Sequence, residues 1–381
     1  MTSFSYSTVP HVRVGPGLAG TLGDECAKLS VRRPLIVTDN GLVTLGLIAP
    51  IAQAISAQCD ALTIFDGVAA DPSEDVVEAA CVVARENNVD GVIAVGGGSS
   101  MDVAKVVSVL MVGDQSLAEM YGVDQLPPGR LPLFLVPTTA GTGSEVTPVA
   151  VITTGATTKA GVSSSVLLPD VAILDAELTL GLPRSATAMT GIDAMVHAIE
   201  AYTSKLKKNP ISDMLALRAL RLLSHNINTV LTQPTDLAAR EAMLLGSMFA
   251  GQAFANAPVA AVHALAYPLG GHYHIPHGLS NSLMLPAVLA FNAPMVQKDY
   301  GELAEELPGG VATSAAGLMV WFDDLIATSG LPATLEAAGV AADDLPMLAA
   351  DAMLQQRLLV NNPVEVTEAC ALQLYEKAWS G

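Results

Sequence analysis

The spacing of apolar residues changes once along this chain, near Leu182 and Pro183, and that change limits the folds available to it. Before this point, short β-branched runs alternate with Ala-rich stretches, which predicts a mostly parallel sheet covered by helices. After it, apolar residues recur every three to four positions with few strand signals, which predicts a helical region. Because domains usually contain about 100 to 200 residues, we expect two domains, residues 1–183 and 184–381.

The expected elements follow from these two patterns. In the first domain, compact apolar runs predict strands at 34–39, 61–65, 91–95, 131–136 and 171–174, with a helix at 76–87. In the second domain, periodic stretches predict helices at 185–204, 212–230, 235–255 and over much of 315–381.

Charge and hydropathy exclude two classes of partner. The chain has 18 Lys and Arg against 37 Asp and Glu, a formal charge of −19, which would repel a nucleic-acid backbone. Its apolar stretches are short or interrupted, well under the roughly 20 residues that span a bilayer. The four cysteines are scattered without CxxC spacing, and the N-terminus does not read as a signal peptide. We therefore expect a cytoplasmic protein without disulfides, bound to neither membrane nor nucleic acid.

Two loops of small residues follow predicted strands. Gly96–Gly98 let an anion approach the backbone closely, and Ser99 or Ser100 can cap the helical stretch that follows. The segment Pro137–Ser144, sequence PTTAGTGS, follows another strand. The glycine run is not a GxGxxG fingerprint, and each loop is also typical of a tight turn. Two such loops at the carboxyl ends of strands in one sheet favour a ligand that carries phosphate.

Asp39 also ends a predicted strand. A carboxylate placed there accepts hydrogen bonds from the adenosine ribose hydroxyls of a dinucleotide and repels a 2′-phosphate, which favours NAD over NADP. The structural alternative is a turn or a helix cap.

A dense group of histidines points to metal chemistry. Of seven histidines, four fall within fifteen residues: His263, His272, His274 and His277. Upstream, Asp193 and His197 are four residues apart in a helical stretch, so both lie on one face. Such a pair alone is more often a surface hydrogen bond, but the cluster is hard to explain structurally. One carboxylate and three imidazoles suit Fe²⁺ or Zn²⁺ and leave a coordination position for an alcohol oxygen.

Four segments together resemble the iron-containing, or group III, alcohol dehydrogenases, in the order and spacing typical of that family: Gly96–Lys105, Pro137–Thr147, Gly191–Tyr202 and His263–His277. The resemblance implies an α/β dinucleotide-binding domain and an all-α domain, an architecture shared with dehydroquinate synthase. It implies hydride transfer between NAD and a small alcohol or aldehyde, and a homodimer or larger homo-oligomer.

The same resemblance implies roles for individual residues. The metal, Fe²⁺ or Zn²⁺, is expected on Asp193, His197, His263 and His277. Contacts with the dinucleotide are expected from Asp39, Gly96, Gly97, Gly98, Ser99, Asp102, Thr138, Thr139, Thr142, Ser144 and Lys159, the last of these in a predicted turn at 153–160.

Tyr267 departs from the family pattern, because many members carry a histidine four residues after the third metal ligand. An unperturbed tyrosine, with a pKa near 10, is a poor base at neutral pH but can donate a hydrogen bond. We therefore expect Tyr267 to shape the pocket. The proton relay is expected to use His272 or His274, the ribose hydroxyls of the cofactor, or water.

The same architecture admits other functions. A dehydroquinate synthase would need several cations for its phosphorylated acid substrate, but residues 244–261 contain no Lys or Arg. Glycerol dehydrogenase and maleylacetate reductase are nearer alternatives, and the latter would also need cations for two carboxylates. A non-catalytic NAD-binding sensor would not require four metal-type ligands. The sequence therefore predicts a metal-dependent, NAD-linked alcohol dehydrogenase.

Overall fold

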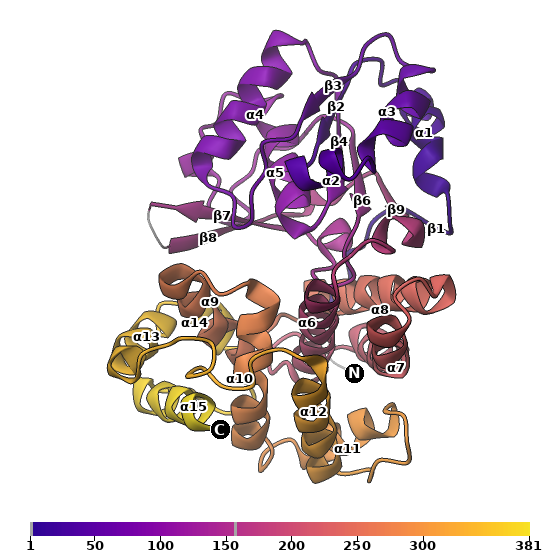
Figure 1. Ribbon diagram of the computed structural model, residues 1–381. Helices are drawn as coiled ribbons and strands as arrows, with labels where there is room; N and C mark the ends of the chain where they lie inside the picture. The colour runs from indigo at the N-terminus through magenta and orange to yellow at the C-terminus, as the bar shows by residue number, and fades with distance from the viewer. Residues whose placement is uncertain (1–2, 156–157) are drawn as a thin grey trace. The chain divides into compact units, whose positions relative to one another are not determined.

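The computed structural model describes residues 3–155 and 158–381, which divide into two compact units. The sheet unit contains residues 7–139 and 143–181, and the helical unit contains residues 3–6, 140–142 and 182–381. The predicted fold class is confirmed, because the first part of the chain builds a mostly parallel α/β structure and the second part is helical (Figure 1).

The sheet unit is built on six parallel strands in the order β1-β9-β6-β4-β2-β3. The strands are β1 (His11–Val14), β2 (Pro34–Val37), β3 (Thr63–Phe65), β4 (Gly91–Gly96), β6 (Leu133–Pro137) and β9 (Val171–Leu174). Its helices are α1 (Leu22–Lys28), α2 (Asn40–Thr44), α3 (Ile48–Ser56), α4 (Glu74–Glu86) and α5 (Gly98–Leu110).

The central strands are apolar along their whole length because helices cover both faces of the sheet. Side chains alternate between the faces, so that Leu35 and Val37 of β2 join one core cluster and Ile36 joins the other. Helices α4 and α5 contribute to the first cluster, and α1 and α3 to the second (Figure 1). Burial on both faces explains why these strands could be recognised as continuous apolar runs.

The strand order reverses between β2 and β4, because β3 lies outside β2 whereas β6 and β9 continue on the other side of β4. In open α/β sheets, ligands bind beyond the carboxyl ends of the strands at such a point. Asp39 follows β2 and Gly97 follows β4. The fold therefore brings two of the predicted dinucleotide-binding segments to the edge where such a ligand is expected.

A second, small sheet was not expected from the sequence. It has the order β5-β8-β7, from β5 (Gly122–Val123), β7 (Val149–Thr154) and β8 (Thr158–Ser163), with β7 and β8 antiparallel. The predicted turn at 153–160 is thus largely strand, although its residues 156 and 157 lie outside the described residues. Both strands are only half-buried; β8 has no continuous apolar run, and the run Val149–Ile152 of β7 was not predicted as a strand.

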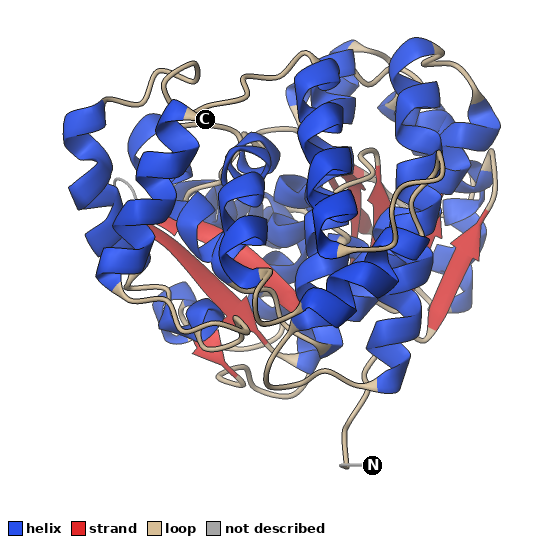
Figure 2. Ribbon diagram, turned by 90° about the horizontal axis from the view of Figure 1, so that it is seen from below, coloured by secondary structure: helices blue, strands red, loops and turns tan. Residues whose placement is uncertain are grey.

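Residues 182–381, all of which are described, form helices and no strand (Figure 2). The helices are α6 (Arg184–Thr203), α7 (Pro210–Thr232), α8 (Leu237–Asn256), α9 (Ala261–Tyr273), α10 (His277–Asn292), α11 (Gln297–Glu305), α12 (Ala315–Ser329), α13 (Leu345–Ala352), α14 (Gln356–Leu359) and α15 (Glu368–Ser380). Short 3-10 helices across the chain are η1 (Leu18–Thr21), η2 (Leu117–Glu119), η3 (Ser144–Val146), η4 (Ser165–Leu167), η5 (Ala176–Thr179) and η6 (Ala342–Asp344).

Helix α6 is the central element of the helical unit. It packs against α7, α8 and α10, and every residue from Gly191 to Thr203 is buried. A helix that is buried all round in this way lies inside the bundle, so the polar side chains on it need a partner or a function. Among the described residues, no helix is both long enough and apolar enough to cross a membrane.

Candidate functional site

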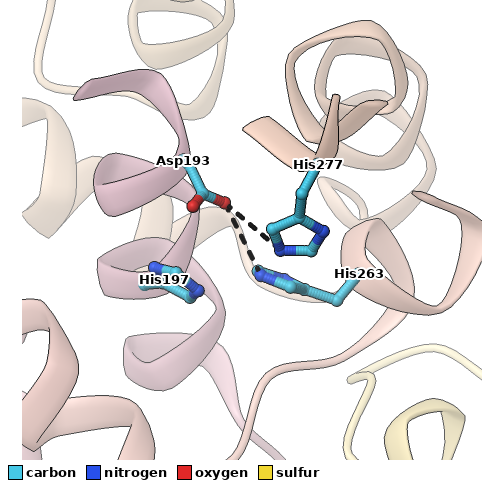
Figure 3. Close-up of side chains that lie close together, drawn as sticks. All are labelled: Asp193, His197, His263 and His277. Carbon is cyan, nitrogen blue, oxygen red and sulfur yellow. Dashed lines mark ion pairs between the residues drawn. The ribbon is translucent and has the colours of Figure 1, made fainter. Parts of the chain in front are cut away.

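Three helices of the helical unit bring one carboxylate and three imidazoles together. Helix α6 supplies Asp193 and His197, one turn apart on the same face, α9 supplies His263, and α10 supplies His277 as its first residue. One potential ligand atom from each side chain lies within 4.8 Å of all the others (Figure 3). The structure thus assembles the four predicted metal-binding side chains from positions that span 85 residues of sequence.

The four groups differ in exposure and in charge. Asp193, His197 and His263 are buried, whereas the side chain of His277 is 31% exposed, so the cluster is accessible on the His277 side. Burial lowers the pKa of His197 to about 3, which keeps this imidazole neutral. Burial alone would raise the pKa of Asp193, but the neighbouring histidines outweigh it and hold that pKa below its usual value. An ionised carboxylate and a neutral imidazole are the protonation states that bind metals.

The spacing of the ligand atoms fits a shared cation. The Nε2 atoms of His263 and His277 each lie 3.8 Å from Oδ1 of Asp193. Two ligands of a tetrahedral zinc ion, each at about 2.1 Å, are about 3.4 Å apart. The same three atoms also face Nδ2 of Asn281, at 2.6 Å from Asp193, 3.1 Å from His263 and 3.3 Å from His277. Their lone pairs therefore converge on one small region, as the residues of a metal site should.

Packing around the cluster orients its members. The ring of His197 stacks between Phe254 of α8, at 4.3 Å between centroids, and His263, at 4.6 Å. Gly278 allows α10 to approach α6, because a Cβ there would lie 2.5 Å from the carbonyl oxygen of Met189. The position of His277 at the start of α10 thus depends on a glycine next to it.

Tyr267, predicted to shape the pocket, and His272, one of the two histidines predicted for the proton relay, lie in different surroundings. Tyr267 lies one turn after His263 on α9, and its ring centroid is 6.0 Å from that of His277. His272 is further along α9, and its Nε2 lies 3.0 Å from Oδ2 of Asp351. The structure therefore places Tyr267 beside the metal cluster, whereas the ring of His272 contacts Asp351, which is not part of that cluster.

In the sheet unit, the glycine loop and the threonine loop are neighbours. The strands pair in register with Gly96 opposite Pro137, and the backbone N–H of Thr138 donates to the carbonyl of Gly96 at 3.0 Å. A Cβ on Gly97 would lie 3.6 Å from Thr139. The sequence prediction that Ser99 or Ser100 caps the following helix is wrong, because the N-cap of α5 is Gly97 and no side chain caps it. The first turn of α5 therefore presents backbone N–H groups, an arrangement suited to phosphate.

Asp102 and Ser144, both predicted to contact the dinucleotide, take part in a buried network. Ser144 donates to Oδ1 of Asp102 at 2.7 Å, and the N–H of Val151 donates to Oδ2 at 2.9 Å. Lys105 donates to Ser144 at 2.7 Å and to the carbonyl of Val149 at 2.7 Å. Burial raises the pKa of Asp102 and lowers that of Lys105 to about 8. The network joins α5 to β7, and direct contact of these two residues with a dinucleotide stays a prediction.

Three more predicted cofactor residues are placed as follows. Asp39 caps α2 by accepting the N–H of Leu42 at 3.0 Å, the structural alternative weighed above, and its Oδ2 is not used in that bond. Lys159 forms an ion pair of 2.6 Å with Asp71. Thr142 is half-buried in a segment grouped with the helical unit.

Sequence reasoning missed two polar side chains that contact the cluster. Asn281 lies one turn after His277 on α10, and Glu200 lies one turn after His197 on α6. Helical spacing places each on the face of its neighbouring ligand, which was the available signal. Glu200 lies in the segment Gly191–Tyr202, which carries part of the family resemblance, but the sequence predicted no role for it.

Two family models cover almost the whole chain. Residues 10–176 match "Iron-containing alcohol dehydrogenase", and residues 187–379 match "Fe-containing alcohol dehydrogenase family, C-terminal". Long-chain-alcohol dehydrogenase 1 of Geobacillus thermodenitrificans is 38% identical over 380 residues, which cover 98% of this chain and 96% of the relative.

Solved structures agree with these matches. The crystal structure of a 1,3-propanediol oxidoreductase superposes with a TM-score of 0.95 at 33% identity, over 99% of this chain and 100% of that one. A sulfoacetaldehyde reductase from Bifidobacterium kashiwanohense, in complex with NAD⁺, superposes with a TM-score of 0.91 at 30% identity, over the full length of both chains.

Proposed function

The chain belongs to the iron-containing alcohol dehydrogenase family, and we propose that Asp193, His197, His263 and His277 hold its metal ion. It is an NAD-dependent oxidoreductase that transfers hydride between NAD(H) and a small alcohol or aldehyde. The observation that carries the residue assignment is the convergence of the four ligand atoms within 4.8 Å. Family membership also decides against the dehydroquinate synthase lyase as the reaction of this chain.

A divalent ion bound there supplies Lewis acidity, which lowers the pKa of an alcohol hydroxyl or polarises an aldehyde carbonyl. The chain contributes one negative charge through Asp193 and three neutral donors, so half of the positive charge of a divalent ion would be left uncompensated. The exposed side of His277 is where a substrate oxygen can enter. Tyr267, beside His277, is proposed to line this entry, and participation of His272 in proton transfer stays a prediction.

We also propose that residues 1–183 bind NAD and that residues 184–381 hold the metal and the substrate. NAD supplies the nicotinamide carbon that accepts or returns the hydride. Support for the assignment comes from the loop Gly96–Ser99, the neighbouring Thr138 and Thr139, and the free N–H groups that begin α5. Direct contacts from Thr142 and Lys159 are part of the same proposal.

Replacing Asp39 with asparagine should weaken the preference for NAD over NADP about tenfold. The substitution removes a negative charge whose repulsion raises the binding free energy of the 2′-phosphate by roughly 1 to 3 kcal/mol. Asparagine keeps the oxygen that caps α2, so the local fold should persist. The measurement is the ratio of kcat/KM with NAD to kcat/KM with NADP. Asp66→Asn, at a half-buried carboxylate that accepts a hydrogen bond from the side chain of Asn40, is the control. An unchanged ratio in Asp39→Asn would exclude Asp39 as the discriminating residue.

We propose a small primary alcohol or aldehyde as the substrate. The relatives are named for long-chain alcohols, 1,3-propanediol and sulfoacetaldehyde, whose hydroxyl and aldehyde groups are the two forms that hydride transfer interconverts, while the rest of each molecule differs. A panel of short primary alcohols, diols and aldehydes, followed by NADH absorbance, identifies the preferred one. A homodimer or larger homo-oligomer and a cytoplasmic location stay predictions.

Removal of the metal tests the proposed function. Protein purified without oxygen and stripped by a chelator should lose at least about a hundredfold of its oxidation rate and regain it when Fe²⁺ or Zn²⁺ is added back. NADH binding, followed by its fluorescence, should survive the treatment and serves as the control for damage. Full activity in protein shown by mass spectrometry to lack metal would overturn the proposal.

A further inference from the structure

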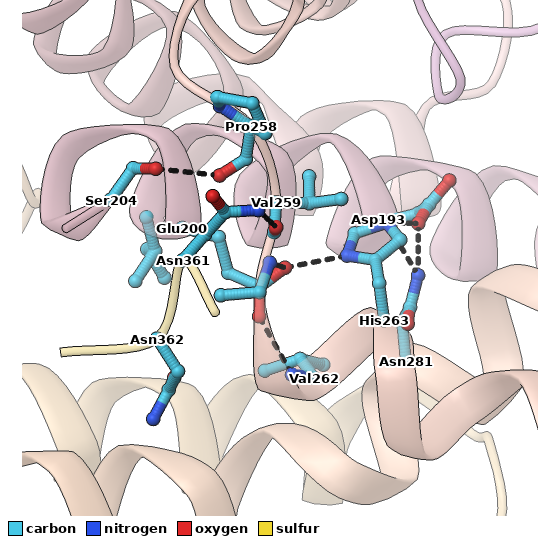
Figure 4. A network of polar contacts seen from close by, with 12 residues as sticks. Asp193, Glu200, Ser204, Pro258, Val259, Val262, His263, Asn281, Asn361 and Asn362 are labelled. Carbon is cyan, nitrogen blue, oxygen red and sulfur yellow. Dashed lines mark hydrogen bonds and ion pairs between the residues drawn. The ribbon is translucent and has the colours of Figure 1, made fainter. Parts of the chain in front are cut away.

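We propose that Glu200 is a positioning residue of the metal centre, whose carboxylate holds the ring of His263 so that Nε2 faces the other ligands. This inference rests on the metal assignment proposed above and extends it to a residue that binds no metal itself. Its basis is a buried chain of hydrogen bonds that begins on α6 and ends at the cluster (Figure 4).

Glu200 is placed for this role by helical geometry. It lies seven residues after Asp193 and three after His197 on α6, so the three side chains share one face. The residue is 4% exposed, and Oε2 of its carboxylate lies 2.6 Å from Nδ1 of His263. A carboxylate taken out of water in this way is costly unless several donors satisfy it.

Those donors come from the beginning of the helix that carries His263. The N–H of Ala260 donates to Oε2 at 3.0 Å, and the N–H of Val262 donates to Oε1 at 2.7 Å. Helix α9 has Ala260 as its N-cap and no side-chain cap of its own. Glu200 therefore satisfies backbone donors that α9 leaves open, and it places the first turn of α9 beside α6.

The same contacts determine which nitrogen of His263 carries the proton. A carboxylate that accepts two backbone N–H groups remains an acceptor toward the imidazole, so Nδ1 must be the donor. In the neutral ring, Nε2 then keeps its lone pair. On that side, the amide N–H of Asn281 faces Nε2 at 3.1 Å, as expected if Nε2 is an acceptor. A histidine that binds a metal through one nitrogen commonly donates the other N–H to a carboxylate, which fixes the tautomer and the ring orientation.

The structural alternative is that Glu200 only stabilises the start of α9 through its backbone N–H groups. The variant Glu200→Gln distinguishes this role from the orientation of His263. The amide oxygen of glutamine can still accept from Val262, but its NH₂ group would face Nδ1 of His263 and favour the tautomer with the proton on Nε2. We expect the affinity for Zn²⁺, measured by competition with a chelating dye, to fall about ten- to hundredfold. Nitrogen NMR of histidine-labelled, metal-free protein should show the exchange of tautomers at His263.

Glu302→Gln is the matched control, because Glu302 also accepts a hydrogen bond from a side chain of α6, the hydroxyl of Tyr202 at 2.6 Å. Its Zn²⁺ affinity should equal that of the unaltered protein. Should Glu200→Gln fail to fold, Glu200→Asp keeps the charge with a shorter reach and is expected to lower the affinity by a smaller factor.

The outcomes distinguish this inference from the proposed function. If the unaltered protein binds Zn²⁺ and a folded Glu200 variant binds it equally well with the original tautomer, the role of Glu200 is refuted and the metal assignment stands. If the unaltered protein does not bind Zn²⁺ or Fe²⁺ at all, the proposed function is refuted and this inference with it. Weaker Zn²⁺ binding together with an altered His263 tautomer supports the inference. Weaker Zn²⁺ binding with the original tautomer and a lowered unfolding midpoint would refute it and show that Glu200 only stabilises the start of α9.

Discussion

Replacing His263 with alanine should lower kcat/KM for NAD-linked alcohol oxidation by about a thousandfold, equivalent to roughly 4 kcal/mol of transition-state stabilisation. The change removes one of the four converging donors and leaves the buried carboxylate of Glu200 without its imidazole partner. Metal content should fall with the rate. Initial rates and metal per protomer, both measured on protein prepared without oxygen, test this expectation together.

The chain offers a matched control for that variant. His225 is an exposed histidine on α7 of the same unit. Among the described residues, it belongs to no cluster of side chains that could bind a metal. His225→Ala should keep both the rate and the metal. If His263→Ala also keeps both, the four residues do not form the reactive centre.

Replacing Gly278 with alanine should destabilise the protein by about 2 kcal/mol and lower its activity at least about tenfold. The added Cβ would lie 2.5 Å from the carbonyl oxygen and 2.8 Å from the carbonyl carbon of Met189, so α10 must move away from α6. Because His277 immediately precedes Gly278, this movement displaces a proposed ligand. Urea denaturation gives the free energy of unfolding, and the metal content reports the displacement.

Gly301→Ala is the appropriate comparison, since Gly301 also lies within a helix of the helical unit, α11. A Cβ there would have its nearest neighbour at 3.5 Å, an ordinary contact. This substitution should stabilise the protein by about 0.5 to 1 kcal/mol, because alanine is a better helix former. A Gly278→Ala protein as stable and active as Gly301→Ala would show that the close approach of α10 to α6 is not required.

The main sheet and the long helices were predictable because their patterns are local. Strands such as β2 and β4 are buried on both faces and read as apolar runs. The pair β7 and β8 was not predicted because both strands are only half-buried, β8 has no continuous apolar run, and their pairing depends on contacts that composition does not reveal. The N-cap of α5 was predicted at Ser99 or Ser100 but is Gly97, because each of several successive small residues can occupy the position before a helix.

The candidate site was predictable in part. The spacing of Asp193 and His197 and the cluster of histidines are visible in the sequence, but the choice of His263 and His277 came from family resemblance. The carboxylate of Glu200 meets a segment about sixty residues later, so its role depends on the tertiary hydrogen bonds that join α6 to the first turn of α9. Asp102 and Ser144 could be recognised as parts of sequence motifs, but the sequence did not reveal that they form a hydrogen bond with each other across 42 positions.

On the proposed assignment, all four metal donors belong to the helical unit, and every predicted dinucleotide contact except Thr142 belongs to the sheet unit. We therefore expect the ion and the coenzyme to bind independently of each other. In a cell short of iron, newly made copies would still capture NAD and hold it idle. The shortage would then appear as a lower maximal rate at unchanged coenzyme affinity, and a supply of iron would reactivate existing molecules without new synthesis.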